Sequence, residues 1–178
     1  MPRRSADTRA EIRAVALELF AQRGFEQTSL REIAERLGIT KAALYYHFPS
    51  KDELISELFT PLVADLEAFG VDAVAAGREG MRATLDGYLE LCHRHKMLFQ
   101  GLLRDFGALA RLEVLDALVR KRVELDRALV GSDRPADRAR AVIAFGGLQD
   151  CVVLMAEEPL ESYRAAAVDA ALRALLPD

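Results

Sequence analysis

Hydrophobic residues recur along this chain with the 3.6-residue period of α-helices, and no stretch shows the two-residue alternation of a half-buried strand. Near the N-terminus, for example, Ile12, Val15 and Leu19 fall on one stripe. The pattern predicts an all-α fold with helices over residues 8–22, 29–37, 40–48, 51–68, 79–96, 98–106, 109–129, 135–157 and 160–176.

Capping residues and breakers sharpen the boundaries of the first helices. Four residues suit the N-cap position, three of them with a glutamate three places later as in a capping box: Thr8, Ser29, Thr40 and Ser50. Three residues end the helices that precede them: Gly24, Gly38 and Pro49. Such short helices are unstable alone, so we expect them to pack into one compact N-terminal module. Further along, Gly107 is expected to separate two helices.

Composition and charge indicate a soluble globular protein and argue against a strongly basic nucleic-acid binder or a membrane protein. The chain has 178 residues, of which 51% are hydrophobic and 29% charged, and its net charge is −4. Residues 1–56 carry nine Lys or Arg against eight Asp or Glu, so any contact with nucleic acid must use a local patch. No apolar run approaches 18 residues and the N-terminus lacks an apolar signal core, which predicts a cytoplasmic protein with no membrane contact.

Residues 29–48 have the layout of a helix-turn-helix, with Gly38 at the turn. On the second helix Leu44 and Phe48 lie close together and suit a core. Lys41, Ala42, Tyr45 and Tyr46 project from another side of the helix. The candidate base contacts are Thr40, Lys41, Ala42 and Tyr45, and the candidate phosphate contacts are Tyr46, His47, Lys51, Ser29 and Arg31. The alternative is a helical hairpin whose tyrosines only cover an amphipathic surface.

The segment "TSLREIAERLGITKAALYYHFPSKDEL", with the preceding "ELFAQRGFEQTSL", closely resembles the tetracycline-repressor (TetR) family of bacterial regulators. The resemblance covers residues 8–55 and is carried by Phe20, Gly24, Phe25, Thr28, Ile33, Ala34, Gly38, Tyr45, Phe48, Lys51 and Leu54. It implies an Ω-shaped all-α homodimer with a DNA-binding domain at 1–50 and an effector-binding and dimerisation domain at 51–178. The recognition helix would be 40–47. Arg3 and Arg4 would form an arm into the minor groove, or else a disordered basic tail.

The last two predicted helices suggest a dimer interface. Glycines inside a helix cost about 1 kcal/mol each relative to alanine, and close approach of another helix would explain the pair in helix 135–157. Helix 160–176 carries a stripe of small residues, and the resemblance implies a four-helix dimer contact. The predicted interface residues are Phe145, Gly146, Gly147, Gln149, Val153, Tyr163, Ala166, Ala167 and Ala170. A core contact within one chain is the alternative.

The middle helices are mostly core by their periodicity, and the resemblance implies that part of this region encloses an effector pocket. We select Tyr88, Cys92 and Phe106 as pocket candidates, because a polar edge or a large ring helps to orient a ligand. The stretch "CHRHK" at 92–96 does not make a metal site, since His93 and His95 point nearly opposite ways on a helix. We predict no cofactor.

The predicted function is a ligand-responsive transcriptional repressor, which binds a palindromic DNA operator as a dimer and is released by a small-molecule effector. An activator or a global DNA binder of the same fold is the alternative. A non-DNA-binding all-α enzyme or metal carrier is a distant third, because no catalytic constellation stands out in the sequence.

Overall fold

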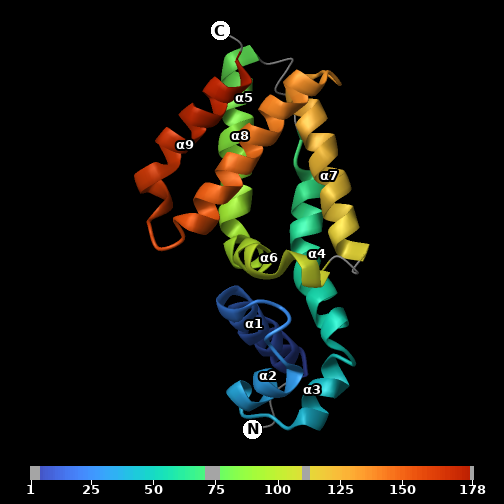
Figure 1. Cartoon of the computed structure of the whole chain (residues 1–178). Helices are drawn as coiled ribbons and strands as arrows, with labels where there is room; N and C mark the ends of the chain where they lie inside the picture. The colour runs from blue at the N-terminus through green and yellow to red at the C-terminus, as the bar shows by residue number, and fades with distance from the viewer. Residues whose placement is uncertain (1–4, 71–76, 110–112, 177–178) are drawn as a thin grey trace. The chain divides into compact units, whose positions relative to one another are not determined.

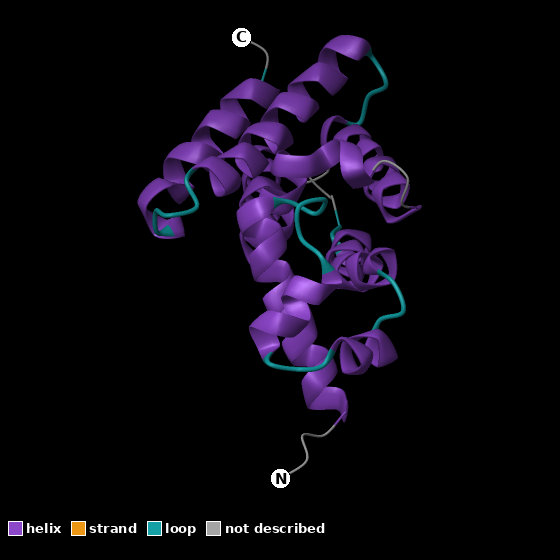
Figure 2. Ribbon diagram, turned by 60° about the horizontal axis from the view of Figure 1, so that its bottom comes forward, coloured by secondary structure: helices purple, strands orange, loops and turns teal. Residues whose placement is uncertain are grey.

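A computed structural model describes residues 5–70, 77–109 and 113–176, with the backbone alone at 5, 6 and 106–109. Every regular element in this part of the chain is an α-helix, which confirms the all-α prediction (Figures 1 and 2). The helices are α1 Ser5–Arg23, α2 Leu30–Leu37, α3 Lys41–His47, α4 Lys51–Ala68, α5 Gly77–Arg94, α6 Lys96–Leu109, α7 Glu113–Val130, α8 Pro135–Leu154 and α9 Leu160–Leu175.

Several predicted boundaries differ from those in the structure; helix 135–157, for example, ends at Leu154. Helix α1 already begins at Ser5, so Thr8 lies inside the helix and does not cap it. The break expected at Gly107 lies instead at Asp105, whose φ of −152° and ψ of 44° interrupt α6. The side chain of Asp105 bonds to a backbone N–H elsewhere in the fold, as described below, and this tertiary contact is invisible to a local pattern.

The chain forms two compact units. The N-terminal unit contains Met1–Leu62 and Met97–Asp116, and the C-terminal unit contains Val63–Lys96 and Ala117–Asp178. These packing units are drawn differently from the expected functional domains, 1–50 and 51–178, which stay predictions.

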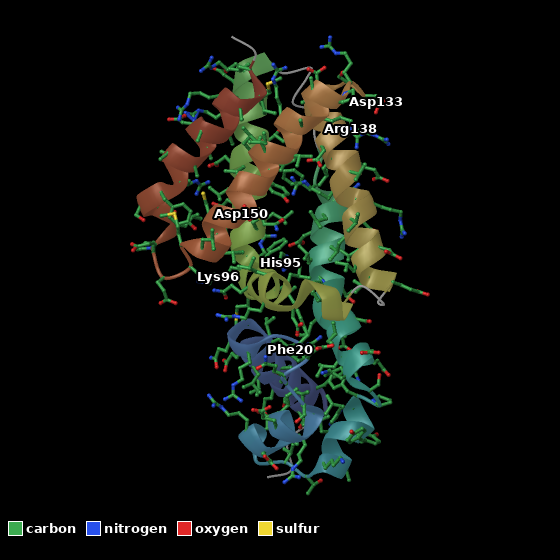
Figure 3. All side chains as sticks on the ribbon, in the orientation of Figure 1. Phe20, His95, Lys96, Asp133, Arg138 and Asp150 are labelled. Atoms are coloured by element: carbon green, nitrogen blue, oxygen red, sulfur yellow. The ribbon has the colours of Figure 1, made fainter. Side chains whose placement is uncertain are left out.

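Aromatic rings fill the core of the N-terminal unit. The ring centroid of Phe25 lies 4.9 Å from that of Phe20 and 5.9 Å from that of Phe59. All three side chains are buried. Phe20 belongs to α1, where Figure 3 labels it, and Phe59 belongs to α4. Phe25 lies in the turn between α1 and α2. The cluster therefore packs this turn against α1 and α4.

Helix α6 packs against the same turn. An added Cβ on Gly101 would lie 2.9 Å from two ring carbons of Phe25, so only glycine fits there. The Asp105 carboxylate accepts a hydrogen bond from the backbone N–H of Glu26 at 2.6 Å. Arg104 Nε donates to the carbonyl of Ala21 at 2.9 Å. Three positions on α6 therefore hold the end of α1 and the turn after it.

In the C-terminal unit α5, α8 and α9 pack on one another (Figure 1). The rings of Tyr88 on α5 and Phe145 on α8 lie 4.2 Å apart between centroids, and Phe69 adds an edge-on contact with Tyr88 at 5.9 Å. Among the described residues, no helix is long and apolar enough to span a bilayer.

The Gly101 contact predicts the outcome of a small substitution. Gly101→Ala should lower the free energy of unfolding by about 1–3 kcal/mol, because the buried Phe25 ring has no room to retreat. Gly87→Ala is the control, since its Cβ would lie 3.4 Å from Phe69, an ordinary contact. Denaturant unfolding of both variants measures the difference, and equal stability of the two would refute the packing described.

Candidate functional site

Capping bonds build the helix-turn-helix. Ser29 Oγ accepts the N–H of Glu32 at 3.2 Å and starts α2, and Thr40 Oγ1 accepts the N–H of Ala43 at 3.1 Å and starts α3. Gly38 adopts a left-handed φ of 66°, which glycine tolerates best. Its N–H bonds to the Glu35 carbonyl at 3.2 Å. The predicted N-caps Ser29 and Thr40 and the predicted glycine turn are therefore present.

Helix α3 has a sharply divided surface. Leu44 and the C-cap residue Phe48 are fully buried in the N-terminal unit. On the other side Tyr46 exposes 81% of its surface and Tyr45 42%. Lys41 and Ala42 are exposed beside them. The helix thus presents a cation, two phenols and a small residue outward from a firmly buried inner face.

The outward side chains also contact one another. The Lys41 ammonium lies 5.4 Å from the ring centroid of Tyr45, within range of a cation–π contact. The rings of Tyr46 and the half-buried His47 meet edge to face at 5.3 Å. These contacts limit the freedom of the four side chains before any partner binds.

The start of α2 carries two more predicted contacts. Ser29 is exposed, and although its Oγ accepts a bond, its hydroxyl hydrogen remains available to donate. Arg31 Nε donates to Glu35 at 2.7 Å, and this bond raises the pKa of Arg31. The other guanidinium N–H groups of this exposed arginine can reach a further acceptor.

The ammonium group of Lys51 forms contacts that conflict with its predicted phosphate contact. Its ammonium donates to the carbonyls of Phe25 at 2.8 Å, Thr28 at 3.2 Å and Glu26 at 3.4 Å. A lysine ammonium has three N–H donors, so all of them are used within the unit. The predicted phosphate contact of Lys51 conflicts with this geometry, and we assign it instead to holding the turn between α1 and α2.

Two residues near α3 were missed by the sequence analysis. Arg9 on α1 hydrogen-bonds both to Glu57 on α4 and to the carbonyl of His47 at the end of α3. Arg9 and Glu57 are 48 positions apart, and neither belongs to a local motif. The predicted arm of Arg3 and Arg4 lies outside the described residues.

Two of the three effector-pocket candidates lie in a closed core. Tyr88 and Cys92 on α5 are buried, and burial raises the pKa of Cys92 to about 12 and also raises the pKa of Tyr88. Arg122 on α7 donates to Tyr88 Oη at 3.3 Å and to Asp126 at 2.9 Å. The side chain of Phe106 falls outside the described part of the chain.

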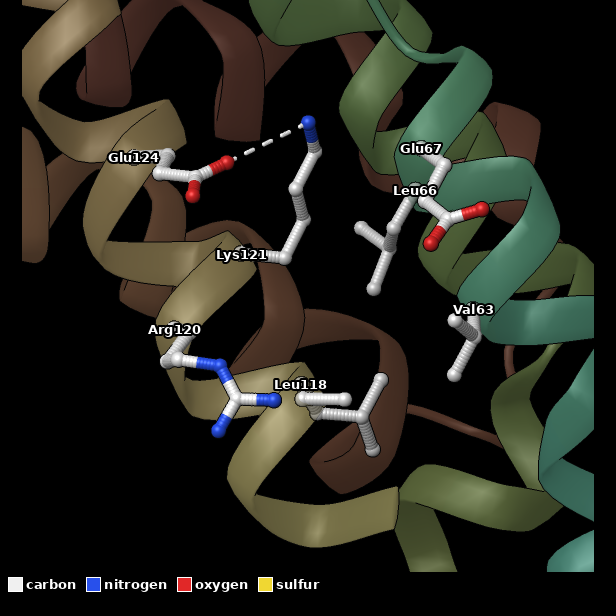
Figure 4. A pocket seen from close by; sticks show the side chains of 8 residues that line it. Val63, Leu66, Glu67, Leu118, Arg120, Lys121 and Glu124 are labelled. Atoms are coloured by element: carbon white, nitrogen blue, oxygen red, sulfur yellow. Dashed lines mark ion pairs between the residues drawn. The ribbon is translucent and has the colours of Figure 1, made fainter. Parts of the chain in front are cut away.

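A groove lies between α4 and α7 (Figure 4). Its volume is about 220 Å³, and its apolar lining comes from Val63, Leu66, Ala117 and Leu118. Charged side chains complete the lining: Glu67, Arg120, Lys121 and Glu124. Lys121 Nζ lies 3.5 Å from Glu124, a loose ion pair that a ligand can replace.

The predicted dimer residues divide into two groups. Phe145 has no exposed surface and Tyr163 is buried, so both pack within their own chain and the prediction is wrong for them. The exposed residues are Gly147, Ala166 and Ala170, and the half-buried ones are Gly146, Gln149, Val153 and Ala167. For these seven the interface stays a prediction.

The exposed side of α8 and α9 is more apolar than the sequence suggested. Ile143 exposes 62% of its surface and Leu154 exposes 73%. Between the two helices runs a groove of about 180 Å³, lined mostly by small and aliphatic residues that include Ile143, Gly147 and Ala170. We call it the α8–α9 groove.

Two residues of the stretch 92–96 form hydrogen bonds with Asp65 on α4. His95 Nε2 lies 2.8 Å from Asp65 Oδ2, and Arg94 Nη1 donates to the same oxygen at 2.8 Å. These bonds, chiefly the one with His95, lower the pKa of Asp65. The described residues contain no group of three or more His, Cys, Asp or Glu able to hold a metal ion.

Comparison with known proteins places the N-terminal part in one family. Residues 12–58 match the model for bacterial regulatory proteins, tetR family. The chain is 38% identical over 78 residues to the HTH-type transcriptional repressor KstR2 of Rhodococcus jostii (strain RHA1), covering 44% of this chain and 38% of the relative. It is 49% identical over 53 residues to the HTH-type transcriptional regulator AcrR of Shigella flexneri, covering 30% and 25%. The matched parts thus span well under half of these relatives.

Solved structures extend the similarity along the chain. A TetR-like transcriptional regulator from Rhodococcus sp. RHA1 superposes with a TM-score of 0.72 at 25% identity, covering 98% of each chain. A transcriptional regulator of the TerR/AcrR family from Aquifex aeolicus VF5 gives a TM-score of 0.69 at 22% identity, covering 92% of this chain and 96% of that one. The latter similarity shows the fold alone.

The reassignment of Lys51 can be tested by stability. Lys51→Met should lower the free energy of unfolding by about 1–3 kcal/mol, because it leaves partly buried carbonyls without their donor. Lys41→Met makes the same chemical change on the exposed face and should stay within about 0.5 kcal/mol of the parent. If the two variants unfold at the same denaturant concentration, Lys51 has no structural role.

Proposed function

Since the chain belongs to the tetR family of bacterial regulatory proteins, we propose that it is a ligand-responsive transcriptional repressor. It binds a palindromic operator as a homodimer and releases it when a small-molecule effector binds. The observation that carries the proposal is the outward face of α3, where Lys41, Tyr45 and Tyr46 stand exposed opposite a buried inner face. The chemistry is binding, and we expect it to take place in the cytoplasm.

The outward face of α3 suits the major groove. A groove about 12 Å wide admits one helix, and a recognition helix contacts base edges with its early residues. Thr40, Lys41, Ala42 and Tyr45 occupy that part of α3 and are the proposed base contacts. The small side chain of Ala42 lets the backbone approach closely.

Phosphate contacts then come from the flanks. Tyr46 and His47 follow on α3, and Ser29 and Arg31 lie at the start of α2. The free N–H groups of that helix end and its positive dipole favour an anion. Such contacts set the register of the protein on the duplex, while the base contacts select the sequence.

Repression is favoured over activation by the names of relatives. KstR2 of Rhodococcus jostii is named a transcriptional repressor. A relative from Escherichia coli (strain K12), 27% identical over 96% of this chain and 88% of its own length, is named "Probable acrEF/envCD operon repressor". The position of the operator relative to the promoter distinguishes a repressor from an activator of the same fold.

The α8–α9 groove supports the proposed homodimer. Exposed aliphatic residues beside a row of glycine and alanine allow a second copy to approach closely and bury apolar surface. A dimer also presents two copies of α3 to two half-sites, which one short helix needs for adequate affinity. The proposed interface keeps Gly146, Gly147, Gln149, Val153, Ala166, Ala167 and Ala170.

The proposed effector site lies in the C-terminal unit. The α4–α7 groove combines apolar side chains with two cations, Arg120 and Lys121, and two carboxylates, Glu67 and Glu124, which suits an amphipathic molecule with a polar end. Tyr88 and Cys92 lie beneath the surface and would meet an effector only after local opening. Effector binding would favour a dimer whose two recognition helices no longer match successive major grooves.

Removal of one proposed base contact should weaken DNA binding. Lys41→Ala is expected to cost about 1–3 kcal/mol in affinity for the intergenic DNA upstream of the chain's own gene. Lys96→Ala, which removes the same charge at the start of α6, should leave affinity unchanged. Fluorescence anisotropy across salt concentrations measures both, and a Lys41→Ala curve that overlays the parent would remove Lys41 from the interface.

A charge placed in the α8–α9 groove should prevent dimer formation. Ile143→Glu would desolvate a carboxylate at the proposed interface, so sedimentation velocity should show a monomer at concentrations where the parent is a dimer. Val119→Glu makes the same change at an exposed residue of α7 and should leave the dimer intact. A dimeric Ile143→Glu variant would place the interface elsewhere.

A further inference from the structure

Arg9 on α1 binds two other helices at once. Its Nε donates to Glu57 Oε1 at 3.1 Å, and its Nη2 pairs with Glu57 Oε2, which makes a two-point contact between guanidinium and carboxylate. Its Nη1 donates to the backbone carbonyl of His47 at 2.6 Å. We call this set, Arg9 with Glu57 and the His47 carbonyl, the Arg9 clamp.

The clamp closes on the last turn of α3. His47 is the final residue of that helix and Phe48 is its C-cap. The Arg9 guanidinium carbon lies 4.3 Å from the centroid of the Phe48 ring, so the same side chain also covers the cap residue. A cation at a helix C-terminus satisfies an orphan carbonyl and opposes the negative end of the helix dipole.

Glu57 holds the arginine in place from α4. Arg13, one turn further along α1, donates to Glu57 Oε1 at 3.1 Å, so the carboxylate has two cationic partners. The hydrogen bond with Arg9 is the main cause that lowers the pKa of Glu57. The pKa of Arg9 is raised by the same bond.

Helix α3 needs such support because it has only seven residues. A helix of that length is not stable by itself. Its N-terminal end is fixed by Thr40 and the glycine turn, and its inner face by Leu44. At the C-terminal end the hydrogen bond from Arg9 to His47 joins α3 to both α1 and α4. Side chains that read a surface must be held to within about half an ångström.

We infer that Arg9 and Glu57 are positioning residues for DNA recognition, which set the placement of α3 without touching the duplex. The inference rests on the proposed function. From net charge alone, removal of an acidic group should strengthen binding to a polyanion such as DNA. The inference predicts the opposite for Glu57: removing its charge opens the clamp and weakens DNA binding.

The test compares two glutamates on α4. Glu57→Gln should bind the duplex roughly tenfold more weakly, the order of one lost base contact. Glu53→Gln carries the same charge change four residues earlier, at an exposed position, and should bind equally or more tightly. The salt dependence of affinity should keep its slope in Glu57→Gln, since no phosphate contact is lost. Glu57→Gln that binds as tightly as Glu53→Gln overturns the inference.

Arg9→Lys separates geometry from charge. Lysine keeps the positive charge but lacks the planar fork that spans a carboxylate and a carbonyl. We expect Arg9→Lys to weaken binding about as much as Arg9→Ala. If Arg9→Lys binds like the parent, Arg9 acts as a charge and the clamp is refuted.

Amide hydrogen exchange without DNA tests the clamp independently of the proposed function. Glu57→Gln should speed exchange at Phe48, whose N–H bonds to the Leu44 carbonyl at 2.9 Å, and leave α2 unchanged. Unchanged exchange at Phe48 contradicts the inference, even for a variant with altered stability. If the parent protein binds no DNA but exchange responds as expected, the proposed function fails while the clamp on α3 stands.

Discussion

Burial of Leu44 and Phe48 determines which side of α3 faces outward. Each such side chain contributes about 1.5–3 kcal/mol when fully removed from water, which is large for a seven-residue helix. A rotation of α3 that hid Tyr45 and Tyr46 would expose these two core residues. The accessible cation and phenols are therefore a consequence of core packing, and the proposed interface depends on it.

Polar side chains complete what the hydrophobic core begins. Lys51 donates hydrogen bonds to three carbonyls around the turn after α1, and Asp105 accepts an N–H from the same turn. Arg9 donates to the carbonyl of His47 at the end of α3. In each case a charged group binds backbone that a helix or turn leaves unsatisfied, and such bonds to charged groups contribute more than neutral ones. The short helices thus acquire fixed ends without long runs of secondary structure.

Local sequence signals predicted the helices and the two helix N-caps around the turn well, because the period of Leu30, Ile33 and Leu37 and the caps Ser29 and Thr40 act within a few residues. They failed where the role of a residue depends on contacts with residues far away in the sequence. Lys51 looked available for phosphate because its carbonyl partners lie more than twenty positions away. Phe145 looked like an interface residue because periodicity does not distinguish the face that meets Tyr88 from the face that meets a second chain. The clamp between Arg9 and Glu57 had no local signal at all.

The central claim is that the outward face of α3, with the start of α2, meets duplex DNA. Hydrogen-exchange mass spectrometry of the full chain, with and without saturating intergenic DNA from upstream of its gene, measures this directly. The account predicts protection confined to segments 29–31 and 40–47, with α7 unaffected. Bound DNA that leaves both segments unprotected, or that protects only the C-terminal unit, would contradict it.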